Sequence, residues 1–139
     1  MIDQGGRVVA VGKNVIRFGP FGNVVANAVQ AGNAVYLSGQ VSVDSEGLFI
    51  GVNDLPAQVE QAYKNVRDVL ARLDASLDDV VDETWFVTDM EQVMKNFKQV
   101  YAVRERAYGT NPETTQTLVQ VSALAMPELL VEIKCIAHL

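Results

Sequence analysis

The spacing of apolar residues is strand-like in the first third of the chain. Runs rich in Val, Leu and Tyr at residues 33–39 and 40–43 are followed by the turn residues 44–47 and a third apolar run at 48–50. Such short runs, bounded by Asp, Ser and Gly, predict β-strands. Upstream, residues 7–11 and 15–18 flank a turn-like break at 12–14 and predict a β-hairpin or an added edge strand.

The apolar spacing then becomes helical. Between residues 59 and 73 the apolar positions recur at intervals of three and four, with Asp54 as a candidate N-cap. Thr88 and Glu91 have the spacing of a capping box and predict the start of a second helix, which we expect to end near Gly109.

Three further strands are predicted at residues 81–87, 115–121 and 129–137, which gives an α+β chain. Two helices can cover only one face of such a sheet, yet the last strand carries apolar residues on both faces. We therefore expect the uncovered face to pack against other copies of the chain, since closed homo-oligomers dominate among soluble assemblies. This pattern does not fix the number of copies.

The composition of the chain excludes some classes of binding partner. The formal net charge of −6 and the absence of a Lys/Arg block indicate no nucleic-acid surface. No apolar stretch of membrane-spanning length and no signal-peptide pattern is present, so we expect no membrane association and a cytoplasmic location. The single cysteine, Cys135, and the single histidine, His138, form no metal-site pattern and predict a core thiol and a frayed tail. No cofactor motif is found.

Four segments, in order and spacing, resemble the RidA/YjgF family: Gly19-Pro20-Phe21, the run Val35 to Gln40, Asn65-Val66, and the run Leu130 to Ala137. The resemblance implies a chorismate-mutase-like α+β fold with a mixed sheet and two helices on one face. It further implies a homotrimer with a barrel-like centre and small-molecule clefts between subunits. We accordingly expect residues 1–17 to be an N-terminal extension and residues 18–139 to be one domain.

Active members of this family hydrolyse enamines and imines, and an arginine in a Pro-x-Arg motif holds the substrate carboxylate through two hydrogen bonds. The resemblance aligns Gln116 with that arginine, Thr114 with the proline and Leu118 with a common cysteine. The Gly-Pro-Tyr loop of the family ends here in Phe21, which keeps an aromatic wall without a hydroxyl. Gln116 has no positive charge and cannot donate two parallel hydrogen bonds to a carboxylate. We therefore expect a simple 2-imino acid to bind less well than it does to family members with the arginine.

Glu132, Ser38 and Gly39 do match the family. Glu132 is the candidate catalytic residue, because hydrolysis of a C=N bond needs a group that manages the proton of a water molecule. Ser38 and Gly39 would orient substrate or water. Simpler readings stay open: turn chemistry for Ser38 and Gly39, an ion-paired carboxylate for Glu132, a polar strand face for Gln116 and a core position for Phe21.

Two hypotheses follow. The chain is an enamine or imine hydrolase with an altered pocket at the subunit interface, or it is a non-catalytic trimer that binds a small molecule or a protein through the same clefts. The acidic residues Asp82 and Glu83 near the start of one strand are interpreted as solvated positions.

Overall fold

The computed structural model of the chain describes residues 4–6, 12–109 and 111–139. The strands of its single sheet are β1 (Lys13–Ile16), β2 (Ala28–Ala31), β3 (Ala34–Leu37), β4 (Gln40–Val41), β5 (Val80–Val87), β6 (Thr115–Gln120) and β7 (Val131–His138). The helices are α1 (Leu55–Ala71), the short 3-10 helix η1 (Leu77–Asp79), α2 (Met90–Lys95) and α3 (Phe97–Tyr108).

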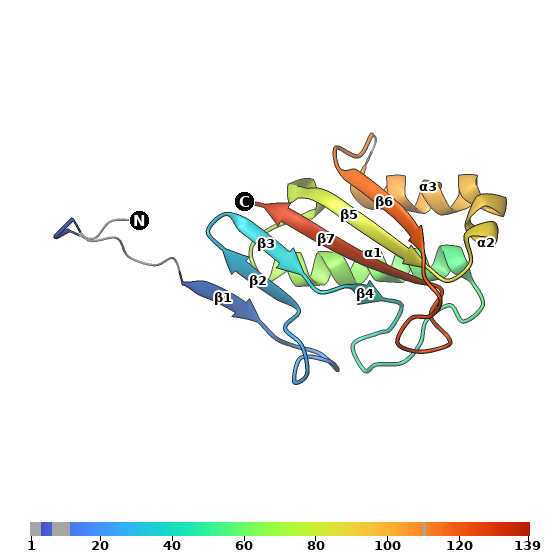
Figure 1. The fold of residues 1–139 in the computed structure, drawn as a ribbon, viewed down its shortest axis with the longest axis horizontal. Coiled ribbons are helices and arrows are strands. Elements are labelled where there is room, and N and C mark those ends of the chain that lie inside the picture. The colour runs from blue at the N-terminus through green and yellow to red at the C-terminus, as the bar shows by residue number, and fades with distance from the viewer. Residues whose placement is uncertain (1–3, 7–11, 110) are drawn as a thin grey trace.

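The sheet is mixed, with the order β1-β2-β3-β7-β5-β6 and with β4 paired to β7 beyond the end of β3. Only β5 and β6 run parallel, and the other pairs are antiparallel. In Figure 1 the sheet lies in front and the helices α1 and α3 lie together behind it. This arrangement confirms the predicted α+β class with the long helices on one face.

Helix α1 forms where the sequence predicts it. The Asp54 carboxylate accepts a hydrogen bond from the Ala57 backbone N–H at 3.1 Å, and Pro56 occupies the first turn, where its missing N–H is not needed. The face toward the sheet is buried and contributes to the core through Val59, Ala62, Tyr63, Val66, Val69 and Leu70.

The second predicted helix is two helices. Asp89, and not Thr88, is the N-cap of α2, and its side chain accepts from the Gln92 N–H at 3.2 Å. The chain turns at Asn96, whose backbone N–H and side-chain amide both donate to the Gln92 carbonyl, at 3.2 and 2.9 Å. Helix α3 then ends at Gly109, which has the positive φ of 91° that glycine adopts without strain.

Several of the sequence predictions for the strands and the C-terminus need correction. Residues 28–31 form β2, which the sequence reasoning did not identify, and residues 48–50 form no strand but a single bridge between Val43 and Phe49. Lys13 and Asn14 lie in β1 and not in a turn, so the expected hairpin break is displaced, while residues 7–11 lie outside the described residues. His138 ends β7, paired with Ala34, and is not a frayed tail.

The side chains of β7 alternate between the two faces of the sheet. Val131, Ile133, Cys135 and Ala137 are fully buried beneath the helices. Glu132 and Ile136 point to the opposite face and are half-buried, and Tyr36, the partner of Ile136 on β3, is 49% exposed. In the described part of the chain this second face has no helix packed on it, so the functional groups there are open to a ligand or to another copy.

Candidate functional site

Glu132 lies in the middle of the uncovered face. Its neighbours across the strands are Val41 on β4 and Phe86 on β5. Its carboxylate packs so closely against the backbone of Gly39 that any side chain at position 39 would overlap it. Glycine at position 39 is therefore required for the carboxylate to occupy this place.

The surroundings of Glu132 favour its neutral form. The apolar neighbours remove water from the carboxyl group, and this burial raises the pKa of Glu132 above its ordinary value of 4.5. The nearby Lys134 ammonium opposes the effect and lowers the pKa. A carboxyl group balanced in this way can accept and return a proton closer to neutral pH than a solvated glutamate.

Ser38 and Gly39 form the link between β3 and β4, beside Glu132. The Ser38 hydroxyl donates to the Ala26 carbonyl at 2.6 Å, which fastens this link to the loop before β2. The structure thus brings three sequence-predicted residues, Ser38, Gly39 and Glu132, into one place.

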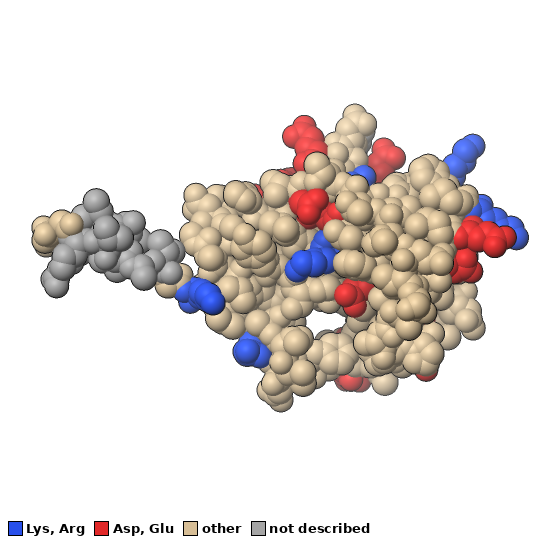
Figure 2. Space-filling model, viewed as in Figure 1, with Lys and Arg blue, Asp and Glu red and all other residues tan. Residues whose placement is uncertain are grey.

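Phe21 lines a cavity whose lining does not include Ser38, Gly39 or Glu132. This cavity of about 520 Å³ lies between the loop 18–21, the residues around β4 and helix α1, and Gln40 lines it together with Phe21. Figure 2 shows an opening in the molecule beside β4, between it and the loop that follows β1 in the same view of Figure 1. The Asn27 side chain holds the loop in position by accepting from the Phe18 N–H at 2.9 Å. Phe21 is 40% exposed and so forms a wall, not part of the core.

Gln116 and Leu118 lie elsewhere. Both are on the edge strand β6, in register with Glu83 and Trp85 of β5, and both point to the helix-covered side of the sheet. Because Glu132 points to the opposite side, Gln116 and Glu132 of one chain do not meet. The structure separates the predicted site residues into three groups: Glu132, Ser38 and Gly39 around the uncovered face, Gln116 and Leu118 at the β6 edge, and Phe21 in the cavity beside α1.

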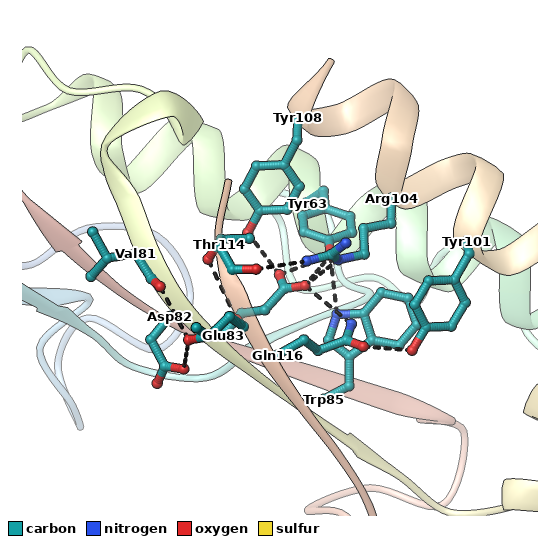
Figure 3. Close-up of polar contacts among 11 residues, drawn as sticks. Tyr63, Val81, Asp82, Glu83, Trp85, Tyr101, Arg104, Tyr108, Thr114 and Gln116 are labelled. Carbon is teal, nitrogen blue, oxygen red and sulfur yellow. Dashed lines mark hydrogen bonds and ion pairs between the residues drawn. The ribbon is translucent and has the colours of Figure 1, made fainter. Parts of the chain in front are cut away.

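The β6 edge contains a buried charged cluster that sequence reasoning missed. Glu83 is fully buried, which corrects the expectation of a solvated acid, and its carboxylate forms an ion pair with Arg104 at 2.5 Å. Figure 3 shows the side chains that surround it. The Tyr63 and Tyr108 hydroxyls donate to one carboxylate oxygen at 2.9 and 2.7 Å, and the Gln116 amide donates to the other at 3.1 Å.

The hydrogen bonds of the cluster extend outward from this carboxylate. Trp85 Nε1 donates to the Tyr63 hydroxyl at 3.1 Å, and the Tyr101 hydroxyl donates to Gln116 Oε1 at 2.5 Å. Among the described residues, no buried side-chain nitrogen or oxygen lacks a hydrogen-bond partner. Full satisfaction is what makes a buried ion pair tolerable in the core.

Burial and the Glu83 charge alter the titration of the neighbours. Burial raises the pKa values of the Tyr63 and Tyr108 hydroxyls far above their ordinary range, and the Glu83 carboxylate raises them further. Both hydroxyls therefore stay protonated and act as donors. Burial also raises the pKa of Cys135, the cross-strand neighbour of Glu83, to about 12, so this thiol is not a nucleophile.

One sequence signal could have identified Glu83 as an inward position. On β5, Glu83, Trp85 and Val87 share one face of the strand, and the last two are typical core residues. The neighbouring acids at residues 78, 79 and 82 masked this alternation. Arg104 and the two tyrosines come from helices, so only the fold brings them to Glu83.

Within the described ranges, no group of three His, Cys, Asp or Glu side chains is placed to hold a metal ion. Of the helices in the part of the chain that the structure describes, none has the length and apolar character to span a membrane.

Comparison with known proteins gives a consistent result. The family described as Endoribonuclease L-PSP matches residues 17–139. The chain is 31% identical over 111 residues to the 3-aminoacrylate deaminase RutC of Acinetobacter baylyi, covering 80% of this chain and 83% of the relative. It is also 31% identical over 133 residues to the chloroplastic Reactive Intermediate Deaminase A of Arabidopsis thaliana, covering 95% of this chain and 65% of the relative.

Solved structures agree on the fold. YyfA from Yersinia pestis, described as a protein of unknown function of the conserved Rid family, superimposes with a TM-score of 0.78 at 28% identity. That match covers 92% of this chain and all of the other.

Proposed function

The chain belongs to the Endoribonuclease L-PSP family, which is the RidA/YjgF family, and from this premise we propose that it hydrolyses a reactive enamine or imine to a carbonyl compound and ammonia. The observation that supports this most is the state of Glu132, a half-buried carboxyl group with a raised pKa, packed against Gly39 on an uncovered face. Relatives named as deaminases supply the reaction class.

The chemistry needs one acid–base group. Glu132 accepts a proton from a water molecule while the water oxygen forms a bond to the carbon of the protonated C=N group, which gives a neutral carbinolamine. Glu132 then returns that proton to the nitrogen and takes the proton of the new hydroxyl group as the C–N bond breaks, so ammonia leaves behind a C=O group. An enamine enters the same route after protonation at carbon gives the protonated imine. A carboxyl group whose pKa lies closer to neutral pH suits both transfers.

We place the substrate between two copies of the chain in a homotrimer. Glu132, Ser38 and Gly39 would come from one copy, and Gln116 and Leu118 from the β6 edge of the next, with Phe21 as an aromatic wall. Two observations support this division: the two groups lie on opposite sides of the sheet within one chain, and β6 is an edge strand that pairs with β5 alone among the described strands.

A second candidate is a non-catalytic trimer that binds a metabolite or protein in the same clefts. The observation in its favour is the residue at position 116, since Gln116 provides no charge for a substrate carboxylate and its amide is already hydrogen-bonded to Glu83 and Tyr101. Cleavage of RNA, which the family description names, is disfavoured by the net charge of −6, because RNA binding depends on contacts between basic residues and phosphates.

The test is a coupled assay. An amino-acid oxidase or dehydratase generates short-lived imines of several side-chain types, and release of 2-oxo acid and ammonia is followed with and without the protein. We expect acceleration for at least one type, and a loss of about 100-fold or more in Glu132→Gln, as for removal of a general acid–base group.

The matched control is Glu105→Gln, which removes an exposed carboxylate on α3 and should leave the rate unchanged. No acceleration across the panel would favour the binding protein. Equal loss of assembly and activity in Glu132→Gln would assign Glu132 a structural role.

A further inference from the structure

We propose that position 116 recognises an uncharged hydrogen-bond acceptor of the ligand, such as an amide or ester carbonyl, and that Tyr101 is the positioning residue that orients the Gln116 amide for it. This inference rests on the proposed function, because it names the substrate class of the same site. It is carried by the hydrogen bonds around Gln116, which Figure 3 shows.

The orientation of the Gln116 amide is determined by its neighbours. The Glu83 carboxylate is paired with Arg104 and accepts hydrogen bonds, so the amide turns Nε2 toward it, as the 3.1 Å contact shows. Oε1 then faces Tyr101, whose hydroxyl donates to it at 2.5 Å. In the described part of the chain, these contacts use one of the two Nε2 hydrogens. The other remains for a ligand, and Gln116 meets that ligand as a donor.

The charge at this place is balanced. Arg104 and Glu83 form an ion pair in which the Glu83 side chain is fully buried and the Arg104 side chain is 13% exposed. Arg104 Nε and Gln116 Nε2 donate to the same oxygen of Glu83, so the cation closest to position 116 is already neutralised. A ligand carboxylate that bound here would lose its hydration and gain only one neutral donor, the Gln116 amide. It would also lie close to the Glu83 carboxylate, so its binding is unfavourable. A neutral carbonyl loses much less hydration.

The surrounding surface suits a small ligand with an apolar part. The Phe97 and Tyr101 rings are stacked with centroids 4.4 Å apart, and Phe97 is 46% exposed. Leu118 lies on the same side of β6 as Gln116 and is partly buried. A flat apolar surface beside one oriented donor is the usual form of a site for a small molecule with a polar end.

The test compares two probes of the same size, pyruvamide and pyruvate, which differ in an amide against a carboxylate. Binding to the full-length protein is measured by NMR titration at one salt concentration. We expect pyruvamide to bind more tightly than pyruvate. Gln116→Met, which keeps the length of the side chain but removes the donor, should reduce the preference by about fivefold to tenfold, the effect of one hydrogen bond.

Tyr101→Phe and Tyr108→Phe form a matched pair. Each removes one hydroxyl from an α3 tyrosine, but Tyr101 contacts Gln116, whereas Tyr108 contacts the other oxygen of Glu83. Tyr101→Phe should reduce the preference for pyruvamide with little change in Tm. Tyr108→Phe should lower Tm and leave the preference unchanged.

Tighter binding of pyruvate, or equal binding of both probes to the unaltered protein, overturns the proposal. The same loss of preference in both tyrosine variants overturns the role given to Tyr101. The proposed function can fail separately from this inference. Glu132→Gln should abolish turnover but keep the ratio of the affinities for pyruvamide and pyruvate. A protein that prefers pyruvamide but hydrolyses no imine would therefore contradict the proposed function and not this inference.

Discussion

Two glutamates of adjacent strands show how the environment decides the role of a residue. Glu83 is fully buried but accepts hydrogen bonds from Tyr63, Tyr108 and Gln116 and pairs with Arg104, so every acceptor position is used. Glu132 is only half-buried, and its neighbours across the strands are apolar. The first arrangement suits a structural ion pair, and the second suits a group that exchanges protons with a ligand.

The raised pKa of Glu132 predicts the pH dependence of hydrolysis. As a base, Glu132 works in its ionised form, so kcat/KM should fall as pH drops through its pKa, at a higher pH than for an ordinary glutamate. Lys134 lowers this pKa, so Lys134→Met should raise it and move the acidic limb of the profile to higher pH. The measurement is kcat/KM between pH 4 and 9, with the exposed lysine variant Lys98→Met as control. An unmoved limb in Lys134→Met would contradict this assignment.

The Glu83–Arg104 pair predicts a non-additive effect on stability. Arg104→Met leaves a buried carboxylate without its cation and should lower the free energy of unfolding by about 3–5 kcal/mol. The double variant Glu83→Gln, Arg104→Met removes both charges and should lose less than the single variant. Urea unfolding at one protein concentration measures this. Arg106→Met, an exposed arginine on the same helix, should change stability by about 1 kcal/mol or less. A double variant that loses as much stability as Arg104→Met, or more, would show that the two side chains act independently.

Single residues were predictable where the signal is local. Asp54 as N-cap, Gly109 as helix end and Cys135 as a core thiol follow from short-range rules, and the structure has them in these places. The cluster around Glu83 was not predictable in the same way, because its partners come from α1, α3 and β6 and meet only in the fold.

At the level of elements, long periodic segments were predicted and short ones were not. Helix α1 repeats its apolar positions over four turns, which leaves little ambiguity. Strand β2 has four residues, Ala-Val-Gln-Ala, without a strand signature, and it becomes a strand because it pairs with β1 and β3 on both sides. Helices α2 and α3 are divided at Asn96, whose backbone leaves the helical conformation at φ −112° and ψ 26°, and no helical period reveals such a break.

The N-cap of α1 can be tested directly. Asp54→Ala removes the acceptor for the Ala57 N–H and should lower the free energy of unfolding by about 1 kcal/mol. Asp68→Ala, which removes an exposed carboxylate from the last turn of the same helix, is the control and should have a smaller effect. Thermal unfolding followed by circular dichroism gives both values. An equal change in both variants would mean that the Asp54 hydrogen bond adds nothing to stability.

For the whole molecule, the uncovered face of the sheet was predicted from the two-sided apolar pattern of the last strand, and the structure has this face without a helix among the described residues. The extent of the domain, with residues 1–17 as an extension, stays a prediction. The homotrimer also stays a prediction, because the structure contains a single chain. Because Glu132 and Gln116 lie on opposite sides of the sheet, a site that contains both must take them from two different copies of the chain.

The most direct test of the shared site mixes two impaired variants. In Glu132→Gln the acid–base group is missing, and in Gln116→Met the recognition group is missing. If each site takes Glu132 from one copy and Gln116 from the next, random trimers from an equal mixture contain both intact groups in about a quarter of their sites. After joint unfolding and refolding, we predict that imine hydrolysis recovers toward a quarter of the unaltered rate. A mixture no more active than the mean of the two variants would contradict a site shared between copies.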